Sequence, residues 1–495
     1  MWPILVGIET EYGFSVEGHG AENQIDDAIA LVRGSPDGRF VGWDYRFEAP
    51  RSDLRGFQVS ALAYDPEDAK HDTGRAKQAD KDVRSDRILS NGARFYNDHG
   101  HPEIATPECW SLEELALQDK AGESVVLRAA EAFSNSCGLQ VKAYKNNTDG
   151  HGSSYGTHES YLVPRKIGFD RLFSSLMPIL VSRQVVCGAG KVGAETGMAA
   201  EFQISQRADF MNERASVDTL YRRPIFNTRD EPHADPSEWA RLHVICGDAN
   251  RILEATSRKV ALIKLALWLE EIEQSPLWRL SDPVRAFSAV SRDLTCEGRI
   301  ELEGGSWTNP GSVLESYVEA GERHLDTRNP MVCEALAFGR ESLELLEDWR
   351  RGGETMSKKV DWAAKHKMLQ GFVESEDTDW SDPVLRAYDL AYHDLDPEES
   401  LFSALQDLEY VDPDPSRETL ASRLHCPTEG TRARARSVAV RKFSDKLVGV
   451  SWGCLEFETD QGRKTVALSP DMIYPESLET LGSVESFLEI LETQK

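Results

Sequence analysis

The sequence lacks the features that mark secreted or disulfide-rich proteins. Its eight cysteines are scattered through 495 residues and form no C-x-x-C pair. Isolated cysteines in a chain of this length indicate reduced thiols, and we therefore expect a cytoplasmic protein. No charged amino terminus followed by an apolar run and a cleavage site is present, so we expect no signal peptide.

Long apolar runs and excess positive charge are also missing. The most apolar helical run, residues 260–269, is too short to span a bilayer and is interrupted by Lys264. The formal net charge of −28 argues against nucleic-acid binding, which needs a basic footprint. The sequence contains no G-x-x-x-x-G-K-[ST] motif, so a P-loop is excluded. We expect neither a membrane nor a nucleic acid as partner.

The patterns that are present predict an α+β fold. Strand patterns occur near the start of the chain and at residues 94–98, 140–144 and 155–163. Ser111 and Glu114 have the spacing of a capping box, which predicts a helix to about residue 133. Residues 258–274 and 332–349 are two further predicted helices. Strands mixed with long helices favour α+β over a doubly wound sheet.

A change of pattern near residues 426–430 predicts two domains, a catalytic domain over 1–425 and a small carboxy-terminal α/β domain over 426–495. The second contains predicted strands at 448–458 and 464–468, and a final helix with Leu481, Val484, Leu488 and Leu491 on one stripe. Residues 65–87 are dense in charge with few apolar anchors, which predicts a mobile loop that could cover the site.

Two glutamates in the first predicted strand share one face. Glu9 and Glu11 point the same way because side chains alternate along a strand. Burying two carboxylates is costly unless a cation neutralises them, and hard divalent cations prefer oxygen ligands. The alternative is a solvated strand face, which the preceding apolar residues 4–6 make less favourable.

A second predicted strand places Arg94, Tyr96 and Asp98 on one face, with Glu103 shortly after it. Arginine offers a fork for phosphate oxygens, and Glu103 offers a second hard ligand. Asp98 is a candidate base or nucleophile. The alternative is a structural ion pair between Arg94 and Asp98, but four residues along a strand separate them too widely.

Other polar groups have weaker signals. His158 and Glu159 fall on opposite faces of a predicted strand, so we do not expect both to ligate one ion. Residues 188–193 match G-x-G-x-x-G without the helix and acidic residue of a dinucleotide site. Arg207 and Arg229 are candidates for phosphate or carboxylate recognition, with surface ion pairing as the alternative.

A basic strip stands out in this acidic chain. It consists of Arg432, Arg434, Arg436, Arg441 and Lys442. Such a strip is typical of a solvated helix face, and it is also a candidate docking surface for an acidic partner.

Ordered motifs through nearly the whole chain resemble the Pup ligase and depupylase group within the glutamine-synthetase-like carboxylate–amine ligases. They lie at residues 7–13, 91–108, 119–123, 145–162, 181–186, 227–235, 241–245 and 389–394. The resemblance implies a curved antiparallel sheet backed by helices. Two features resemble the depupylase branch. Residues 43–57 resemble the start of its inserted loop, here residues 40–88, and the ligases carry one extra residue between Asp98 and His-Pro-Glu103.

The resemblance also implies roles for individual residues. Glu9, Tyr96 and Glu103 are expected to surround Mg²⁺, with Glu11 and His158 as further candidate ligands. Arg94 and Thr106 are expected to contact ATP, Trp452 to lie against the nucleotide, and Asp98 to be the catalytic carboxylate. The family's His-Glu-Asn-Tyr is replaced here by His158-Glu-Ser160-Tyr.

By this resemblance we expect a depupylase that depends on Mg²⁺ and on ATP, or ADP, as a retained cofactor. It would hydrolyse the isopeptide bond between the carboxy-terminal glutamate side chain of Pup, a small modifier, and a substrate lysine. It would also deamidate a carboxy-terminal glutamine of Pup. We expect a monomer whose partners are Pup, or a Pup-like modifier, and pupylated proteins. Alternatives are a Pup–protein ligase, a small-molecule carboxylate–amine ligase and a non-catalytic nucleotide-dependent binding module.

Overall fold

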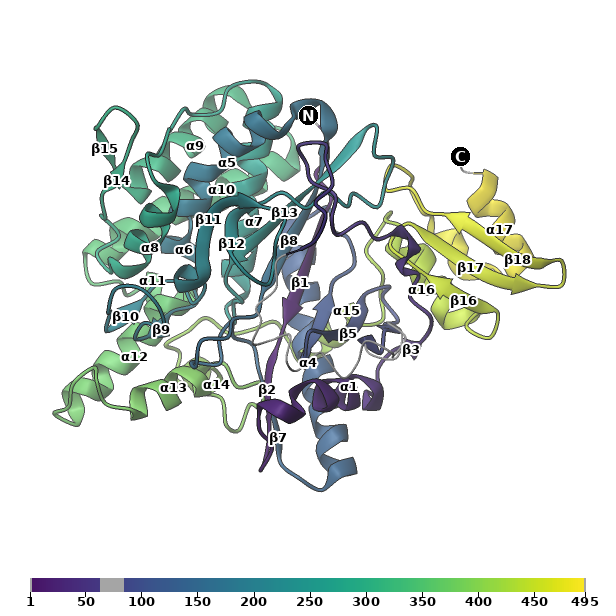
Figure 1. Cartoon of the computed structure of the whole chain (residues 1–495), viewed down its shortest axis with the longest axis horizontal. Coiled ribbons are helices and arrows are strands. Elements are labelled where there is room, and N and C mark those ends of the chain that lie inside the picture. The colour runs from purple at the N-terminus through teal and green to yellow at the C-terminus, as the bar shows by residue number, and fades with distance from the viewer. Residues whose placement is uncertain (1, 63–83, 494–495) are drawn as a thin grey trace.

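A nine-stranded sheet organises the fold (Figure 1). The computed structural model describes residues 2–62 and 84–493. The strand order is β11-β12-β13-β8-β1-β6-β5-β4-β3, and all neighbours are antiparallel except β11 and β12, which are parallel. The strands are β1 (Val6–Glu11), β3 (Arg39–Phe40), β4 (Arg87–Ile88), β5 (Arg94–Asp98), β6 (His101–Ala105), β8 (Thr157–Pro164), β11 (Met211–Ser216), β12 (Arg223–Asn227) and β13 (Trp239–Gly247). The α+β prediction is confirmed, with a parallel pair at one edge.

Strand β1 shows how the sheet separates core from site. Val6 and Ile8 belong to the main hydrophobic core, and the hydroxyl of Thr10 donates to Asp119 in the helix behind. Glu9 and Glu11 therefore point to the other side, which we call the site face. The predicted shared face of Glu9 and Glu11 is thus confirmed.

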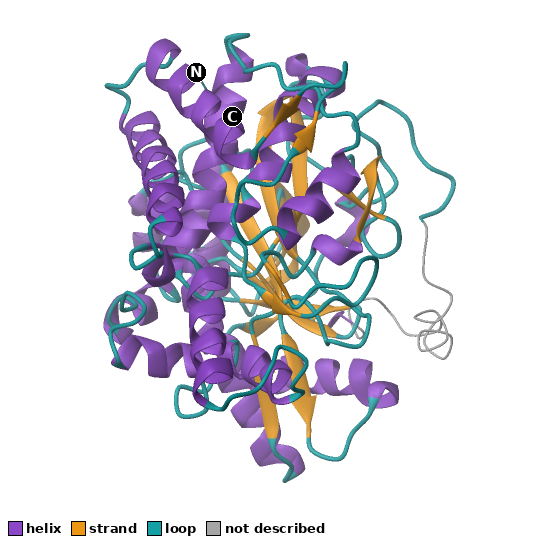
Figure 2. Ribbon diagram, turned by 90° about the vertical axis from the view of Figure 1, so that its left-hand side faces the viewer, coloured by secondary structure: helices purple, strands orange, loops and turns teal. Residues whose placement is uncertain are grey.

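Most of the helices lie to the left of the strands in Figure 2. Helix α4 (Leu112–Cys137) begins where Ser111 Oγ accepts from Glu114 N at 3.1 Å, and it ends at Gly138 in a left-handed conformation. The predicted capping box therefore marks a real helix start. The other helices are α1 (Gln24–Gly34), α5 (Phe169–Ser182), α6 (Gln184–Cys187), α7 (Leu253–Glu271), α8 (Pro283–Arg292), α9 (Pro310–His324), α10 (Pro330–Arg350), α11 (Met356–Lys359), α12 (Asp361–Ser375), α13 (Val384–Tyr392), α14 (Leu401–Asp407) and α15 (Arg417–Arg423).

Smaller sheets surround the main one. They pair β2 (Gly13–Val16) with β7 (Val141–Tyr144), β9 (Lys191–Val192) with β10 (Phe202–Gln203), and β14 (Ile300–Glu301) with β15 (Trp307–Thr308). The glycine-rich run at 188–193 includes β9, and a Cβ on Gly190 would lie 2.9 Å from the Cα of Trp362. This run is therefore packed against α12 and is not among the residues that line the hollow described below.

The carboxy-terminal residues form a lobe at the right of Figure 1. It contains β16 (Leu447–Val450), β17 (Cys454–Thr459) and β18 (Gly462–Ala467), with α16 (Ala433–Lys442) and α17 (Val484–Thr493). Its core also takes in Val41, Trp43 and Ile88 from the amino-terminal part of the chain. The final helix begins at Val484, so the prediction that Leu481 lies on its stripe is wrong. The boundary at residues 425 and 426 stays a prediction.

Part of the predicted inserted loop can be followed. Asp44 N donates to Val450 O at 2.8 Å, Ala49 N donates to Glu231 Oε1 at 2.5 Å, and Leu54 N donates to Thr228 O at 2.7 Å. Residues 44–54 therefore run from the carboxy-terminal lobe to the β12–β13 connection. Most of the predicted mobile stretch at 65–87 lies outside the described residues. Within the described ranges, no helix is long and apolar enough to cross a membrane.

Candidate functional site

Five neighbouring strands send polar side chains to the site face. The residues are Arg241 and His243 on β13, His158 and Ser160 on β8, Glu9 and Glu11 on β1, Glu103 on β6, and Arg94, Tyr96 and Asp98 on β5. Cross-strand pairing brings them together, because Glu9 lies opposite His158 and Glu11 lies opposite Glu103. They form two groups, which we call the glutamate–histidine group (Glu9, His158, His243) and the triacid group (Glu11, Asp98, Glu103).

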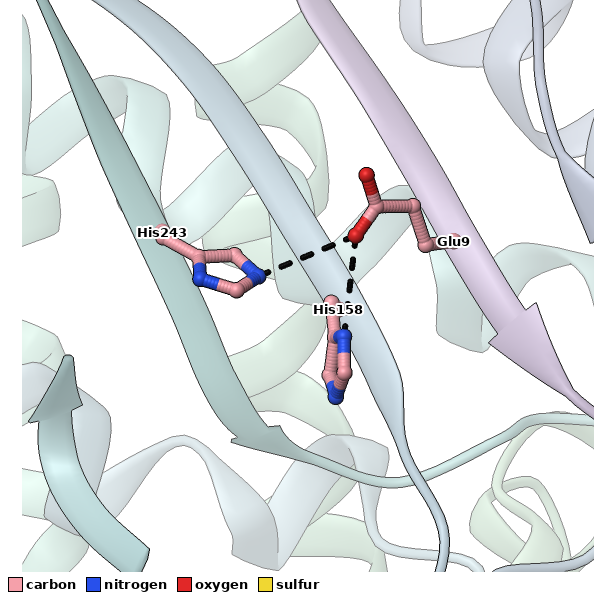
Figure 3. A group of neighbouring side chains, drawn as sticks. All are labelled: Glu9, His158 and His243. Atoms are coloured by element: carbon pink, nitrogen blue, oxygen red, sulfur yellow. Dashed lines mark ion pairs between the residues drawn. The ribbon is translucent and has the colours of Figure 1, made fainter. Parts of the chain in front are cut away.

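The glutamate–histidine group is shown in Figure 3, with its side chains on three adjacent strands. Glu9 Oε2 lies 3.6 Å from His158 Nδ1 and 3.8 Å from His243 Nε2. Burial lowers the pKa of both imidazoles, so both are neutral at pH 7 and able to ligate a metal. Glu159 points to the opposite face and pairs with Arg183, as its alternation with His158 predicted.

Arg241 joins Glu9 from the neighbouring strand. Its Nη2 lies 3.1 and 3.2 Å from the two carboxylate oxygens. Burial alone would raise the pKa of Glu9, but the Arg241 charge and the two histidines hold it well below its usual range. Arg241 also donates to Ser160 Oγ at 2.9 Å. Ser160, the departure from the family motif, thus helps to hold this arginine.

The triacid group has the opposite electrostatic character. Its carboxylate oxygens lie within 4.8 Å of one another. Burial, followed by the negative charge of Asp98, raises the pKa of Glu11 to about 8 and raises that of Glu103 well above its usual range. Glu103 accepts from the Tyr96 hydroxyl at 2.6 Å. A bound cation would favour ionised carboxylates here.

A tight turn sets the position of Asp98. Asp98 and His101 are the closing pair of the β5–β6 hairpin, and only His99 and Gly100 connect them. Both connecting residues have positive φ, 47° and 91°, as a type I′ turn requires. Asn97 supports this turn by accepting from Gly100 N at 3.0 Å. The short spacing seen in the sequence is thus a two-residue turn.

Asp98 is held in its ionised form. Arg84 Nη1 lies 2.5 Å from Asp98 Oδ1, and His99 Nε2 lies 4.0 Å from Oδ2. Burial opposes ionisation, but His99 and Arg84 outweigh it and lower the pKa of Asp98 to about 2. Asp98 and Arg94 do not pair, since Arg94 has its own partner. One carboxylate of the triacid group is therefore anionic beside two with raised pKa values.

Arg94 is enclosed by the segment that precedes it. Its guanidinium bonds to Asp86, with Nε donating to Oδ1 at 2.7 Å. The rings of Trp43 and Tyr96 cover it, with centroids at 4.0 and 3.8 Å from Cζ. Tyr45 adds a further contact at 3.2 Å. In this structure the fork of Arg94 is directed at a protein carboxylate.

A hollow of about 600 Å³, including its open mouth, adjoins the glutamate–histidine group. Thr106 and Trp452, both predicted to contact nucleotide, line it together with Glu9 and Arg241. Thr106 Oγ1 accepts from Ile8 N at 3.0 Å, which joins this wall to β1. The mixture of apolar and charged walls suits a small organic ligand.

Two arginines of the basic strip bond to Glu108, which lines the hollow. Arg432 and Arg436 both bond to Glu108, with Arg432 Nε donating to Oε1 at 2.6 Å. Arg436 also donates to Trp452 O at 3.2 Å and lies 4.9 Å from its ring centroid. Arg432, Arg434 and Arg436 are all buried. The interpretation of residues 432–442 as one solvated strip is therefore wrong, because helix α16 packs these side chains inside.

The other two predicted arginines lie differently. Arg207 is buried and donates to Tyr155 O at 2.7 Å and Ile245 O at 3.0 Å, so it links the backbone of β13 to the segment just before β8. Arg229 is half-buried, donates to Thr219 Oγ1 at 3.2 Å, and keeps a buried Nε with no hydrogen-bond partner among the described residues. Phosphate or carboxylate binding by these arginines stays a prediction.

The donor atoms suit a divalent cation. The triacid group offers only hard carboxylate oxygens, which Mg²⁺ prefers, while the glutamate–histidine group offers one carboxylate and two imidazole nitrogens. Sequence reasoning assigned no role to Arg84, Arg241 or His243. Arg241 and His243 carried a usable signal, since they alternate between apolar neighbours in the way that Glu9 and Glu11 do. Arg84 follows a charged stretch, and its sequence context gave no signal of a role in the site.

The chain is similar to known proteins over most of its length. A family model described as Pup-ligase protein matches residues 4–456. A depupylase of Acidothermus cellulolyticus is 36% identical over 94% of this chain and 93% of its own length. The chain belongs to the Pup ligase/depupylase family. A Pup–protein ligase of Rhodococcus erythropolis is 35% identical over 93% of this chain and 95% of the ligase.

Members of the family have been solved by crystallography. A Pup ligase in complex with Pup superposes with a TM-score of 0.78 at 26% identity, covering 99% of this chain and 93% of the ligase chain. A Pup ligase in complex with ADP gives a TM-score of 0.73 at 28% identity, covering 88% and 96%. The family's fold is thus shared over the whole described chain, while identity to depupylases and ligases is nearly equal.

Proposed function

We propose that this chain is an ATP- and Mg²⁺-dependent depupylase. It hydrolyses the isopeptide bond between the carboxy-terminal glutamate side chain of Pup and a substrate lysine, and it deamidates a carboxy-terminal glutamine of Pup. The observation that carries the proposal is the ionised Asp98 beside Glu11 and Glu103, at the closing pair of a two-residue turn. The short spacing before His-Pro-Glu103, which resembles that of the depupylase branch, supports the choice of depupylase over ligase.

Asp98 supplies the reacting carboxylate. It either attacks the carbonyl carbon of the isopeptide or takes a proton from the attacking water, and both routes need an anion at this position. Arg84 and His99 provide that anion by lowering the pKa of Asp98. Arg229 would bind a substrate oxygen or carboxylate, a role supported by its buried Nε, which has no hydrogen-bond partner among the described residues.

Glu9, Tyr96 and Glu103 would hold Mg²⁺, with Glu11 and His158 as further ligands. When bound, the ion supplies positive charge that offsets the buried carboxylates and polarises the substrate carbonyl. Arg241 keeps Glu9 ionised, and Tyr96 orients Glu103 through its hydroxyl.

The nucleotide would occupy the hollow beside Thr106 and Trp452. The relative solved with ADP supports nucleotide binding by this fold. Arg94 would contact a phosphate only by exchanging the carboxylate of Asp86 for it, because that carboxylate now holds its guanidinium. Arg207 would support the site by holding β13 to the segment just before β8.

The test uses a defined Pup–protein conjugate and the purified chain. Release of Pup with Mg²⁺ and ATP, and none when either is removed, is the expected result. A Pup–protein ligase is the second candidate, favoured by the 35% identity to such a ligase. Incubating the chain with free Pup, a lysine-bearing protein and ATP distinguishes them, because a ligase forms conjugate with equivalent ADP. Conjugate formation without release would overturn the hydrolase proposal.

A further inference from the structure

Helix α16 sends its arginines in two directions. Arg432 and Arg436 are four residues apart and lie on one side of the helix, where both reach Glu108. Arg434 lies between them in the sequence and therefore projects from the opposite side. It lines a second hollow, which shares no residue with the hollow beside Trp452.

The second hollow lies between the loop before α16 and the turn before α17. Its lining residues are Cys426, Pro427, Glu429, Arg434, Glu476, Ser477, Glu479 and Thr480. The loop that carries Cys426 sits near the start of α4, because Gln118 Nε2 donates to Cys426 O at 3.5 Å. The hollow therefore belongs to the junction of the carboxy-terminal lobe with α4.

Arg434 is buried beside this hollow, and its side-chain Nε has no hydrogen-bond partner among the described residues. Its side chain is only 7% exposed. The carboxylate paired with it, Glu476, is 4.0 Å away from Nη1 and is 86% exposed. Arg436, by contrast, is fully used by Glu108, Gly92 O and Trp452 O. A buried guanidinium without partners is costly unless a ligand supplies an oxygen.

The charges around the hollow restrict what that ligand is. Glu429 and Glu476 have no close cation partner at hydrogen-bond distance among the described residues, whereas Glu479 is held by Arg441 at 2.6 Å. An oxyanion alone would meet Arg434 favourably but would face these two carboxylates. A ligand that carries an ammonium group beside its carboxylate satisfies both, because the carboxylate matches the arginine fork and the ammonium matches the acidic rim.

We propose that this second hollow is a binding site for a zwitterionic amino-acid or peptide end, with its carboxylate on Arg434 and its ammonium on the rim carboxylates of Glu429 and Glu476. The site is separate from the reaction chemistry, since no residue of the triacid or glutamate–histidine group lines it. Occupation would give the buried Arg434 a carboxylate at hydrogen-bond distance, which Glu476 at 4.0 Å does not provide.

A cysteine of the second hollow can report on ligand binding there. Cys426 lines it and is exposed, and the other two exposed cysteines are Cys137 and Cys333. In the full-length chain carrying Cys137→Ser and Cys333→Ser, alkylation by iodoacetamide reports on Cys426. We expect N-acetyl-lysine, which has one carboxylate and one ammonium group, to slow this alkylation at least threefold in a saturable manner. Lysine amide, which lacks the carboxylate, should not slow it.

Substitution of the arginine gives the decisive comparison. Arg434→Met should abolish protection by N-acetyl-lysine, and Arg434→Lys should retain part of it. Arg463→Met, at an exposed ion pair on β18, is the matched control and should leave protection unchanged. Melting temperatures verify that each variant folds. If Arg434→Met fails to fold, the comparison of N-acetyl-lysine with lysine amide on the parent chain still decides.

Three results would overturn the proposal. They are absence of saturable protection by N-acetyl-lysine, equal protection in the folded Arg434→Met variant, and stronger protection by inorganic phosphate than by N-acetyl-lysine. The last result would show a simple anion site, in which the acidic rim plays no part.

Discussion

Glu9 and Glu11 stand two residues apart on one strand and on one face, yet their surroundings differ completely. Glu9 meets Arg241 and two histidines, and its pKa falls. Glu11 meets Asp98 and Glu103, and its pKa rises to about 8. The comparison shows that strand alternation sets the direction of a side chain, whereas neighbouring strands set its charge state. Glu9 has a cationic neighbour within the protein, whereas Glu11 has carboxylate neighbours whose negative charge a bound cation would offset.

The largest expected effect concerns the anion within the triacid group. Asp98→Asn removes the charge that Arg84 and His99 maintain, so release of Pup from a conjugate should fall by about 10³-fold or more, the scale of losing a reacting group. Nucleotide binding, measured by titration with a fluorescent ATP analogue, should persist because Asp98 does not line the hollow. Cleavage at near the parental rate would remove Asp98 from the reaction.

Glu108 can be compared with Glu9 and Glu11, because its carboxylate is paired with two arginines of the protein itself. Against the cost of burial, Arg436 and Arg432 lower the pKa of Glu108 to about 2. Its contribution to stability is therefore present above the unfolded pKa of about 4.3 and is lost as pH falls toward 2. Glu108→Gln removes the anionic partner that Arg432 and Arg436 share, and we expect the free energy of unfolding to drop by about 3 kcal/mol at pH 7.

Denaturant unfolding between pH 7 and pH 3 measures this effect. The difference between the parent chain and Glu108→Gln should shrink as pH falls below about 4.3. Glu458→Gln, in an exposed pair with Arg463, is the matched control and should change stability by less than about 0.5 kcal/mol. A pH-independent difference would contradict the ion-pair explanation.

Glu9→Gln should lower the unfolding free energy by about 2 kcal/mol, because it removes a charged partner from the half-buried Arg241. The loss is smaller than at Glu108 because Arg241 retains Ser160 and Glu231. Denaturant unfolding in Mg²⁺-free buffer gives the value. Unchanged stability would mean that Arg241 does not depend on Glu9.

Trp452→Leu tests the wall of the hollow. Loss of the aromatic surface should weaken ATP binding by about tenfold, equal to about 1.4 kcal/mol, while leaving the fold intact. Isothermal titration measures the affinity. Trp307→Leu, at an exposed tryptophan on β15, is the control that should keep the parental affinity. Equal affinities of both variants would place the nucleotide elsewhere.

Of the two glutamates on β1, Glu11 is expected to have the smaller effect on stability. Glutamine resembles the protonated carboxyl that a pKa of about 8 implies at pH 7, so Glu11→Gln should change stability by less than about 1 kcal/mol without Mg²⁺. The rise in melting temperature on adding Mg²⁺ should shrink, because one hard ligand is lost. A stability loss as large as that of Glu9→Gln would contradict the inferred difference in charge state between Glu9 and Glu11.

Local patterns predicted much of this molecule. The capping pair Ser111 and Glu114 gave the start of α4, and alternation gave the shared faces of β1 and β5. The same reasoning failed for residues 432–442, where composition suggested a solvated strip. Burial of Arg432 and Arg436 depends on Glu108, which lies more than 300 residues earlier in the sequence. A local sequence pattern contains no information about a contact between residues so far apart in the chain.

By itself, the sequence determined the family, the α+β class and the direction of Glu9, Glu11, Tyr96 and Asp98, because periodicity and motif order are properties of the chain. Only the tertiary structure decided which carboxylates have cationic neighbours and which have one another. It also brought Arg84 to Asp98, paired Arg94 with Asp86 and left the Nε of Arg434 without a hydrogen-bond partner among the described residues. Electrostatic energies depend on distances across strands and lobes, and those distances exist only in the folded chain.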